Sequence, residues 1–155
     1  PTGRDLDLAG HPIRVCEVFA ELDGTAYLER VAVNKPAAVV KAKRAIKKAF
    51  QCQLDGRGFA LVEILSPCPT YYQRKNNMGD ALTAMVDYKK RSKLKNGCPT
   101  WETVLEPGGD IIVGEFVDRE REDYLTRMRR QLGSNYTEFP PQLEEHESEG
   151  CSNEC

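Results

Sequence analysis

The sequence predicts an α/β fold with three layers, in which helices cover both faces of a parallel sheet. Segments prone to form strands alternate with amphipathic helical segments, and this alternation requires crossovers that lay helices against the sheet. Residues 59–65 are almost continuously apolar, which is typical of a strand buried on both faces. Only three strands are convincing, whereas a doubly wound domain usually has about five or six. The sequence therefore predicts half of a doubly wound sheet with an exposed strand on one side.

The chain opens with a loop at residues 1–5, and a helix is expected to begin at His11-Pro12. Proline is tolerated at the first helical position, because the backbone N–H that it lacks has no helical partner there. Gly24 stands where a helix cap is expected, and β-prone residues 26–33 follow as the first strand.

The longest helix is expected to begin at Pro36 and to end before Asp55-Gly56. Its apolar residues recur at helical spacing, while the other face is basic. The basic residues between positions 35 and 48 are Lys35, Lys41, Lys43, Arg44, Lys47 and Lys48. The strand at 59–65 comes next and stops at Ser66-Pro67-Cys68-Pro69-Thr70, because proline cannot donate to a strand ladder.

In the second half of the chain, the sequence predicts fewer helices and strands. A polar loop at 71–80 leads into a helix over about 80–91, and residues 92–109 are mostly connection. The third strand is expected at 111–117, and a last amphipathic helix at 124–132.

Composition predicts one domain over residues 1–133 and an acidic tail over 134–155. The 155 residues are 40% hydrophobic and 30% charged, as in globular proteins. From Glu138 onward the tail holds six glutamates and no lysine or arginine, so it is expected to be disordered. The net charge of −2 argues against a nucleic-acid partner. The absence of long apolar runs argues against a membrane span.

The cysteines show no regular framework. They stand at Cys16, Cys52, Cys68, Cys98, Cys151 and Cys155, and no secretory signal precedes them. The expected setting is a reducing cytoplasm in which thiols are free or bound to metal. Cys16 and Cys52 are expected to pack inside the fold.

Cys68 is the strongest candidate for a functional residue. It follows the carboxyl end of the 59–65 strand, where open α/β sheets bind ligands. Pro67 and Pro69 fix the backbone on either side, and such rigid presentation of a thiolate suits a metal ligand. A buried free cysteine is the alternative, since one cysteine alone cannot hold a cluster.

The segment around Cys68, GFALVEILSPCPT (58–70), resembles the strand and cysteine loop of the beta subunits of 2-oxoacid:ferredoxin oxidoreductases. Residues 24–56 resemble the segment that precedes this loop in the family, and so do the entry PTGRD and the helix at His11-Pro12. YYQRKNNMGDA (71–81) and IIVGEFVDREREDY (111–124) resemble the 2-oxoglutarate type in particular. The resemblance spans roughly residues 1–132.

The resemblance implies a role for Cys68. Enzymes of this family use thiamine diphosphate to decarboxylate a 2-oxo acid, and an iron–sulfur cluster then carries the electrons to ferredoxin while coenzyme A takes the acyl group. Cys68 matches the loop cysteine that ligates the 4Fe–4S cluster. The implied partners are an alpha subunit, the rest of the beta subunit, ferredoxin, the 2-oxo acid and coenzyme A.

Two family motifs are absent from the sequence. Nothing in it matches the Gly-Asp-Gly-Asp motif through which Mg²⁺ holds the diphosphate, or the paired cysteines that complete the cluster. The chain begins at Pro1, and both motifs would lie upstream of that residue. The expectation is therefore the carboxy-terminal half of the thiamine diphosphate-binding domain, inactive alone. A non-catalytic interaction module and a small cysteine-based metal or redox carrier remain as alternatives.

Other residues have weaker claims to function. Glu63 needs a buried partner or an exposed edge, and structural burial is favoured over contact with the cofactor. Residues 74–76 (Arg-Lys-Asn) would suit coenzyme A phosphates or a dicarboxylate substrate, with a solvated loop as an equal alternative. The basic helix would suit acidic ferredoxin, but a solvated helix face is the favoured interpretation. Cys151 and Cys155, with His146 nearby, lack a strong metal-binding spacing.

Overall fold

The computed structural model describes residues 6–10, 13–106 and 108–135. Contacts divide the chain into two units, residues 1–123 and 124–155. In the second unit, the described part consists of helix α5 (Tyr124–Leu132), as expected, and a short 3₁₀ turn, η3 (Gly133–Asn135). The predicted helix start at His11-Pro12 and residues 136–155 of the predicted tail lie outside the described residues.

The first unit is built on a four-stranded mixed sheet with the order β2-β1-β4-β3. Its strands are β1 (Thr25–Ala32), β2 (Phe59–Leu65), β3 (Ser92–Leu94) and β4 (Ile111–Asp118). β1 pairs with β2 in parallel, and β3 pairs with β4 in parallel. The sheet is therefore mostly parallel, and the α/β class is confirmed.

The pairing of β1 with β4 is antiparallel, which corrects the expectation of a fully parallel sheet. The reason lies in the connection that follows β2. The π-helix η1 (Pro69–Gln73) and helix α4 (Ala81–Arg91) pack against each other, and β3 begins directly after α4. The side chain of Asn34, just beyond β1, donates to Ser92 Oγ at 3.0 Å. β3 therefore begins at the edge of the sheet where β1 and β2 end, and it runs in the opposite direction to them.

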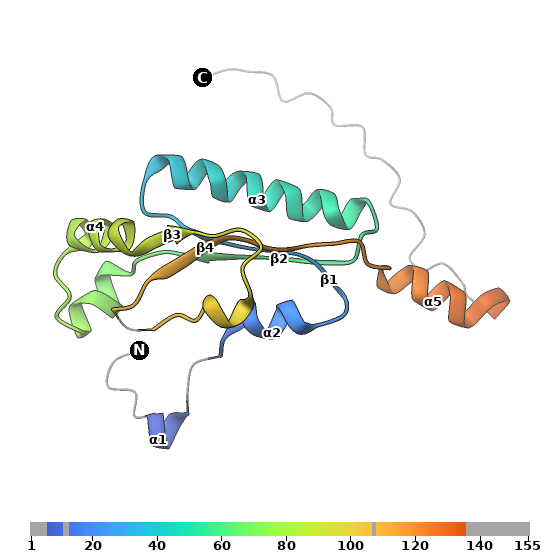
Figure 1. Ribbon diagram of the computed structural model, residues 1–155, viewed down its shortest axis with the longest axis horizontal. Coiled ribbons are helices and arrows are strands. Elements are labelled where there is room, and N and C mark those ends of the chain that lie inside the picture. The colour runs from blue at the N-terminus through green and yellow to red at the C-terminus, as the bar shows by residue number, and fades with distance from the viewer. Residues whose placement is uncertain (1–5, 11–12, 107, 136–155) are drawn as a thin grey trace, which may run out of the picture. The chain divides into compact units, whose positions relative to one another are not determined.

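Helices cover both faces of the sheet, as expected for a three-layer fold (Figure 1). Helix α3 (Pro36–Leu54) packs on β1 and β2, and its buried positions Ala38, Ala42 and Ala45 are small, which lets the helix approach closely. Helix α2 (Val15–Glu21) packs on the opposite face of β1. The short helix α1 (Leu6–Ala9) precedes it in the chain.

Apolar clusters of buried residues fill the layers on either side of β1. On the α2 side, Cys16 and Ala20 pack with Leu28, Ile112 and Phe116. On the α3 side, Cys52 packs with Ala26 and Tyr27. Cys16 and Cys52 are 0% and 1% exposed, so the prediction that both pack inside the fold is confirmed.

Strand β2 is less buried than its sequence predicts. It is the edge strand of the sheet, and none of its residues is fully buried. Phe59 and Ile64 remain 42% and 41% exposed. The expectation of a strand buried on both faces is therefore wrong for this chain by itself, because no strand pairs with the outer edge of β2 among the described residues.

Two regions expected to be irregular contain regular structure. The π-helix η1 occupies the start of the predicted polar loop, and the predicted connection holds β3 and a 3₁₀ turn, η2 (Thr100–Glu102). A strand of three residues is too short to give a recognisable pattern. No helix in the described part of the chain combines the length and hydropathy that a membrane crossing needs.

Gly114 of β4 lies close to the residues that follow β3, and we predict that any larger residue at this position would destabilise the fold. Its φ is +143°, and a β-carbon at this position would lie 2.6 Å from both the Lys95 carbonyl oxygen and Asn96 Oδ1. Gly114→Ala is expected to lower the free energy of unfolding by about 2–4 kcal/mol. Urea denaturation measures this change.

Gly24→Ala is the control, because Gly24 has an ordinary φ and no atom lies within 4 Å of the place that a β-carbon would take there. It should change stability by no more than about 0.5 kcal/mol. Equal effects from the two substitutions would contradict the close approach of β3 to β4.

Candidate functional site

Cys68 lies just beyond the carboxyl end of β2, as the sequence predicts. The parallel partner β1 ends at the same edge, where Ala32 is in register with Leu65 and Val33 N donates to Leu65 O at 2.9 Å. The Cys68 side chain is exposed, which contradicts the alternative of a buried free cysteine. This position leaves the thiol available to a ligand or partner at the end of the sheet.

The loop after Cys68 is held by the backbone of η1. Cys68 is the residue that precedes this π-helix, and its carbonyl oxygen accepts a hydrogen bond from Gln73 N at 3.1 Å. Gln73 is only 3% exposed, and its own carbonyl accepts from Met78 N at 3.0 Å. Asp80 then caps α4 by accepting from Thr83 N at 2.8 Å. The cysteine therefore sits on an ordered turn anchored at its far end by a buried side chain.

The start of η1 favours the charged form of the thiol. Backbone N–H groups of Tyr72 and Tyr71, together with the Thr70 hydroxyl, lower the pKa of Cys68 below that of an ordinary cysteine. The Thr70 hydroxyl oxygen lies 3.9 Å from Cys68 Sγ. Donors converging on sulfur stabilise negative charge in the same way as the N-terminus of a helix. A thiolate is the form that binds metal or acts as a nucleophile.

The described part of this site offers one candidate ligand, Cys68, and no complete metal centre. Among the residues that the structure describes, no group of three or more histidine, cysteine, aspartate or glutamate side chains could hold a metal ion. A 4Fe–4S cluster needs about four thiolates. Cys68 therefore fits the cluster as one of its ligands, and the others would have to come from elsewhere. The same observation leaves no described carboxylate set for Mg²⁺.

Glu63 has a structural partner in Arg30, the residue opposite it in the β1–β2 register. Arg30 Nε lies 2.5 Å from Glu63 Oε2, and Arg30 is 1% exposed. Cys16 Sγ donates to the same carboxylate oxygen at 3.0 Å. Burial, helped by this hydrogen bond, raises the pKa of Cys16 well above its usual range, so this thiol stays protonated. Glu63 thus has the partner that the sequence analysis said it needs, and its side chain is 18% exposed.

Arg30 is the important residue that the sequence analysis missed. Its guanidinium donates to the carbonyl oxygens of Thr103 at 2.5 Å and Ile112 at 3.5 Å, and lies 4.0 Å from a Glu17 carboxylate oxygen. It also lies over the Phe116 ring, 5.6 Å from the centroid. A single arginine within an apolar strand was the available signal, but only the register shows that Glu63 faces it.

The remaining candidates do not gather around Cys68. Arg74 and Lys75 are exposed just past η1, and the Asn76 side chain donates to Tyr72 O at 2.6 Å within the loop. Cys98 lies in another loop and is half-buried. His146, Cys151 and Cys155 lie outside the described residues.

Comparison with curated proteins places this fold and site in a family. The ketoisovalerate oxidoreductase subunit VorA of Methanothermobacter thermautotrophicus is 49% identical over 96 residues, which is 62% of this chain and 20% of the relative. The 2-oxoglutarate synthase subunit KorB of Methanocaldococcus jannaschii is 31% identical over 109 residues, which is 70% of this chain and 37% of the relative. KorB of Methanothermobacter thermautotrophicus is 34% identical over 105 residues, or 68% of this chain and 34% of the relative.

The chain is thus an α/β homologue of oxidoreductase subunits. It belongs to the 2-oxoacid:ferredoxin oxidoreductase family, which confirms the resemblance seen in the sequence. The matched region spans between about a fifth and two fifths of these relatives' length. No protein-family model matches the chain, and no solved structure matches it significantly.

The Arg30–Glu63 pair should be costly to break. Glu63→Gln removes the nearest counter-charge of the buried guanidinium and leaves only the more distant Glu17, so we expect the free energy of unfolding to fall by about 3–5 kcal/mol. Glu102→Gln is the matched control, since Glu102 pairs with Lys95 at 3.3 Å while both side chains are about half exposed. That change should cost less than about 1 kcal/mol. Chemical denaturation that finds equal losses would refute the structural role of Glu63.

The hydrogen bonds to Cys68 predict a site-specific reactivity. Because its pKa is lowered, Cys68 should be more fully ionised near neutral pH than Cys98, whose pKa is raised by burial. Alkylation by iodoacetamide, followed peptide by peptide with mass spectrometry as pH rises, should modify Cys68 first. Thr70→Val should move the Cys68 profile to higher pH. A Cys68 profile that matches or follows that of Cys98 would show that η1 does not stabilise the thiolate.

Proposed function

We propose that this chain is the carboxy-terminal part of the beta subunit of a cytoplasmic 2-oxoacid:ferredoxin oxidoreductase, in which Cys68 ligates a 4Fe–4S cluster. The observation that carries the proposal is the exposed, ionisable thiol at the carboxyl end of β2, in a chain homologous to subunits of this family. The whole reaction would convert a 2-oxo acid and coenzyme A to acyl-coenzyme A, and pass electrons to ferredoxin.

The residues of this chain would hold and orient one corner of the cluster. When bound, the cluster supplies one-electron steps between the thiamine cofactor and the carrier. Pro67 and Pro69 restrict the backbone around Cys68, and the N–H groups of η1 offset the negative charge on its sulfur. Hydrogen bonds to a ligating sulfur are one of the features that set the potential of a cluster.

The rest of the site would come from other segments. Thiamine diphosphate and Mg²⁺ would be bound by the missing part of the beta subunit, because this sequence has no Gly-Asp-Gly-Asp motif. The open edge of β2 and its half-exposed apolar side chains support this view, since a long apolar edge strand normally has a neighbour. The alpha subunit would be a further partner.

The comparisons support two substrates. The sequence resemblance favours 2-oxoglutarate, and the KorB relatives at 30–34% identity agree with it. The VorA relatives are 49% identical, which makes the branched-chain acid ketoisovalerate the stronger candidate. Ferredoxin reduction by the complete assembly with each acid distinguishes them, because one pocket cannot match a branched alkyl group and a second carboxylate equally well.

Cys68→Ser in the complete assembly tests the proposal. Serine keeps the size of the side chain and removes the thiolate, so both the iron content and the rate of ferredoxin reduction should fall, the latter by about tenfold or more. Cys98→Ser is the control, since Cys98 lies in another loop and packs against the apolar cluster that contains Cys16 and Leu28. An assembly with Cys68→Ser that keeps its full iron and turnover would defeat the proposal.

Reconstitution of the lone chain separates this function from that of a small metal or redox carrier. With iron and sulfide the chain alone should give no stable brown product, because Cys68 has no described companion ligands. Cluster formation only after the missing half of the subunit is added would support the proposal. A stable cluster on the lone chain would favour the carrier.

A further inference from the structure

A cleft lies on the α3 side of the sheet, away from Cys68. Among the described residues, helix α3 packs on β1 and β2, and no helix packs to a comparable extent on the same face of β4 and β3. The resulting space has a volume of about 490 Å³ and is lined by α3, β1, β4, β3 and one residue of α4. That volume is in the range of about 300–1,000 Å³ that is typical of small-molecule sites.

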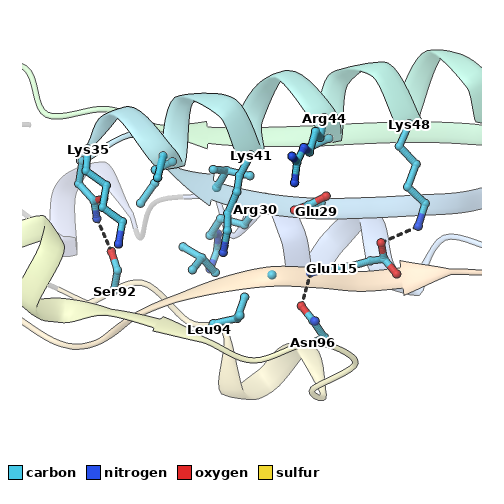
Figure 2. Close-up of a pocket in the computed structure, with 18 of the residues that line it drawn as sticks. Glu29, Arg30, Lys35, Lys41, Arg44, Lys48, Ser92, Leu94, Asn96 and Glu115 are labelled. Carbon is cyan, nitrogen blue, oxygen red and sulfur yellow. Dashed lines mark hydrogen bonds and ion pairs between the residues drawn. The ribbon is translucent and has the colours of Figure 1, made fainter.

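Basic side chains gather along this cleft. Besides Arg30, which is paired with Glu63, they are Lys35, Lys41, Arg44, Lys48 and Lys89. Positions 41, 44 and 48 follow helical spacing on one stripe of α3, and Figure 2 shows Lys41 and Arg44 directed into the space between the helix and the strands. The sequence analysis favoured a solvated helix face for these residues, whereas the structure sets part of that face against a cleft.

Most of these cations form no ion pair with another described residue. Lys48 lies 2.7 Å from carboxylate oxygens of both Glu115 and Asp118. The other four form no ion pair within the described part of the chain. Two carboxylates, Glu29 and Glu115, also line the cleft, and that of Glu29 accepts a hydrogen bond from the Tyr27 hydroxyl while keeping its charge, so the five cations outnumber the carboxylates. The cleft therefore has an excess of positive charge available to a ligand.

The floor of the cleft is apolar and close to the cations. It is formed by Ala38 and Ala45 of α3 and by Val31 and Val113 of the strands; Val113 is half-buried, the other three are buried, and Leu94 of β3, also in the lining, is 61% exposed. The far wall is polar, with Ser92 and Asn96. Asn96 Oδ1 accepts from Glu115 N at 3.1 Å, so the wall is held in place by the strand. A ligand that fills this site needs an apolar part and several negative charges.

We propose that this cleft binds a nucleoside diphosphate or triphosphate, with the base on the apolar floor and the phosphates on Lys41 and Arg44. Inorganic phosphate would leave the floor unused, and a folded acidic partner could touch only the rim. Arginine and lysine are the usual partners of phosphate oxygens. The inference concerns a second site and does not depend on the role of Cys68.

Titration calorimetry of the full 155-residue chain with ADP tests the proposal. The double variant Lys41→Ala/Arg44→Ala should weaken ADP binding by about tenfold or more, because it removes two phosphate contacts. Lys43→Ala/Lys47→Ala is the matched control, since it removes the same charge from α3 outside the cleft. It should change affinity by no more than about twofold. Circular dichroism confirms that both variants remain folded.

Three further probes define the ligand class. Adenosine and pyrophosphate should each bind at least about tenfold more weakly than ADP, because adenosine lacks the phosphate contacts and pyrophosphate lacks the contacts of the base. The proposal is overturned if the unaltered chain does not bind ADP, if both double variants lose affinity equally, or if pyrophosphate binds as tightly as ADP. A glutamate-rich peptide that displaces ADP at a lower concentration would also overturn it, by assigning the cleft to an acidic protein segment.

Discussion

The buried guanidinium of Arg30 is the constraint on which the first unit depends. It joins β1 to β2 through Glu63, reaches η2 and β4 through the Thr103 and Ile112 carbonyl oxygens, and lies near Glu17 of α2. A charge at 1% exposure is tolerated only when its donors are satisfied. This one side chain therefore fixes how α2, the sheet and the irregular connection fit together, and it keeps β2 in register with β1.

That register determines where the Cys68 thiol lies. Glu63 and Cys68 lie on the same strand and its exit loop, so the pairing of Glu63 with Arg30 sets the position at which β2 ends. The prolines and η1 then turn the sulfur outward and stabilise its charge. The hydrogen bond between Cys16 and Glu63 joins α2 to the sheet, whereas the Cys68 thiol lies exposed beyond the end of β2. An exposed ligand on a rigid support suits a cluster shared with other segments.

The regular elements were predictable, because each carries its own pattern. The apolar spacing in α3 and the run of residues in β2 predict both elements to within a residue. The antiparallel direction of β4 and the short strand β3 were not predictable, since they depend on where η1 and α4 pack after β2. Cys68 was found from its flanking prolines. The role of Arg30 and the basic cleft were not found from the sequence. They depend on the register between strands and on where the helix packs, and neither is encoded in a local pattern.

The central claim is that the sulfur of Cys68 bonds to iron in the complete assembly. Replacing Cys68 by selenocysteine and recording selenium X-ray absorption examines this bond directly, without relying on turnover. The account predicts an iron atom bonded to the selenium, with the absorption features of a metal-bound selenolate. A selenium whose neighbours are only light atoms, in an assembly that holds its full iron content, would contradict it.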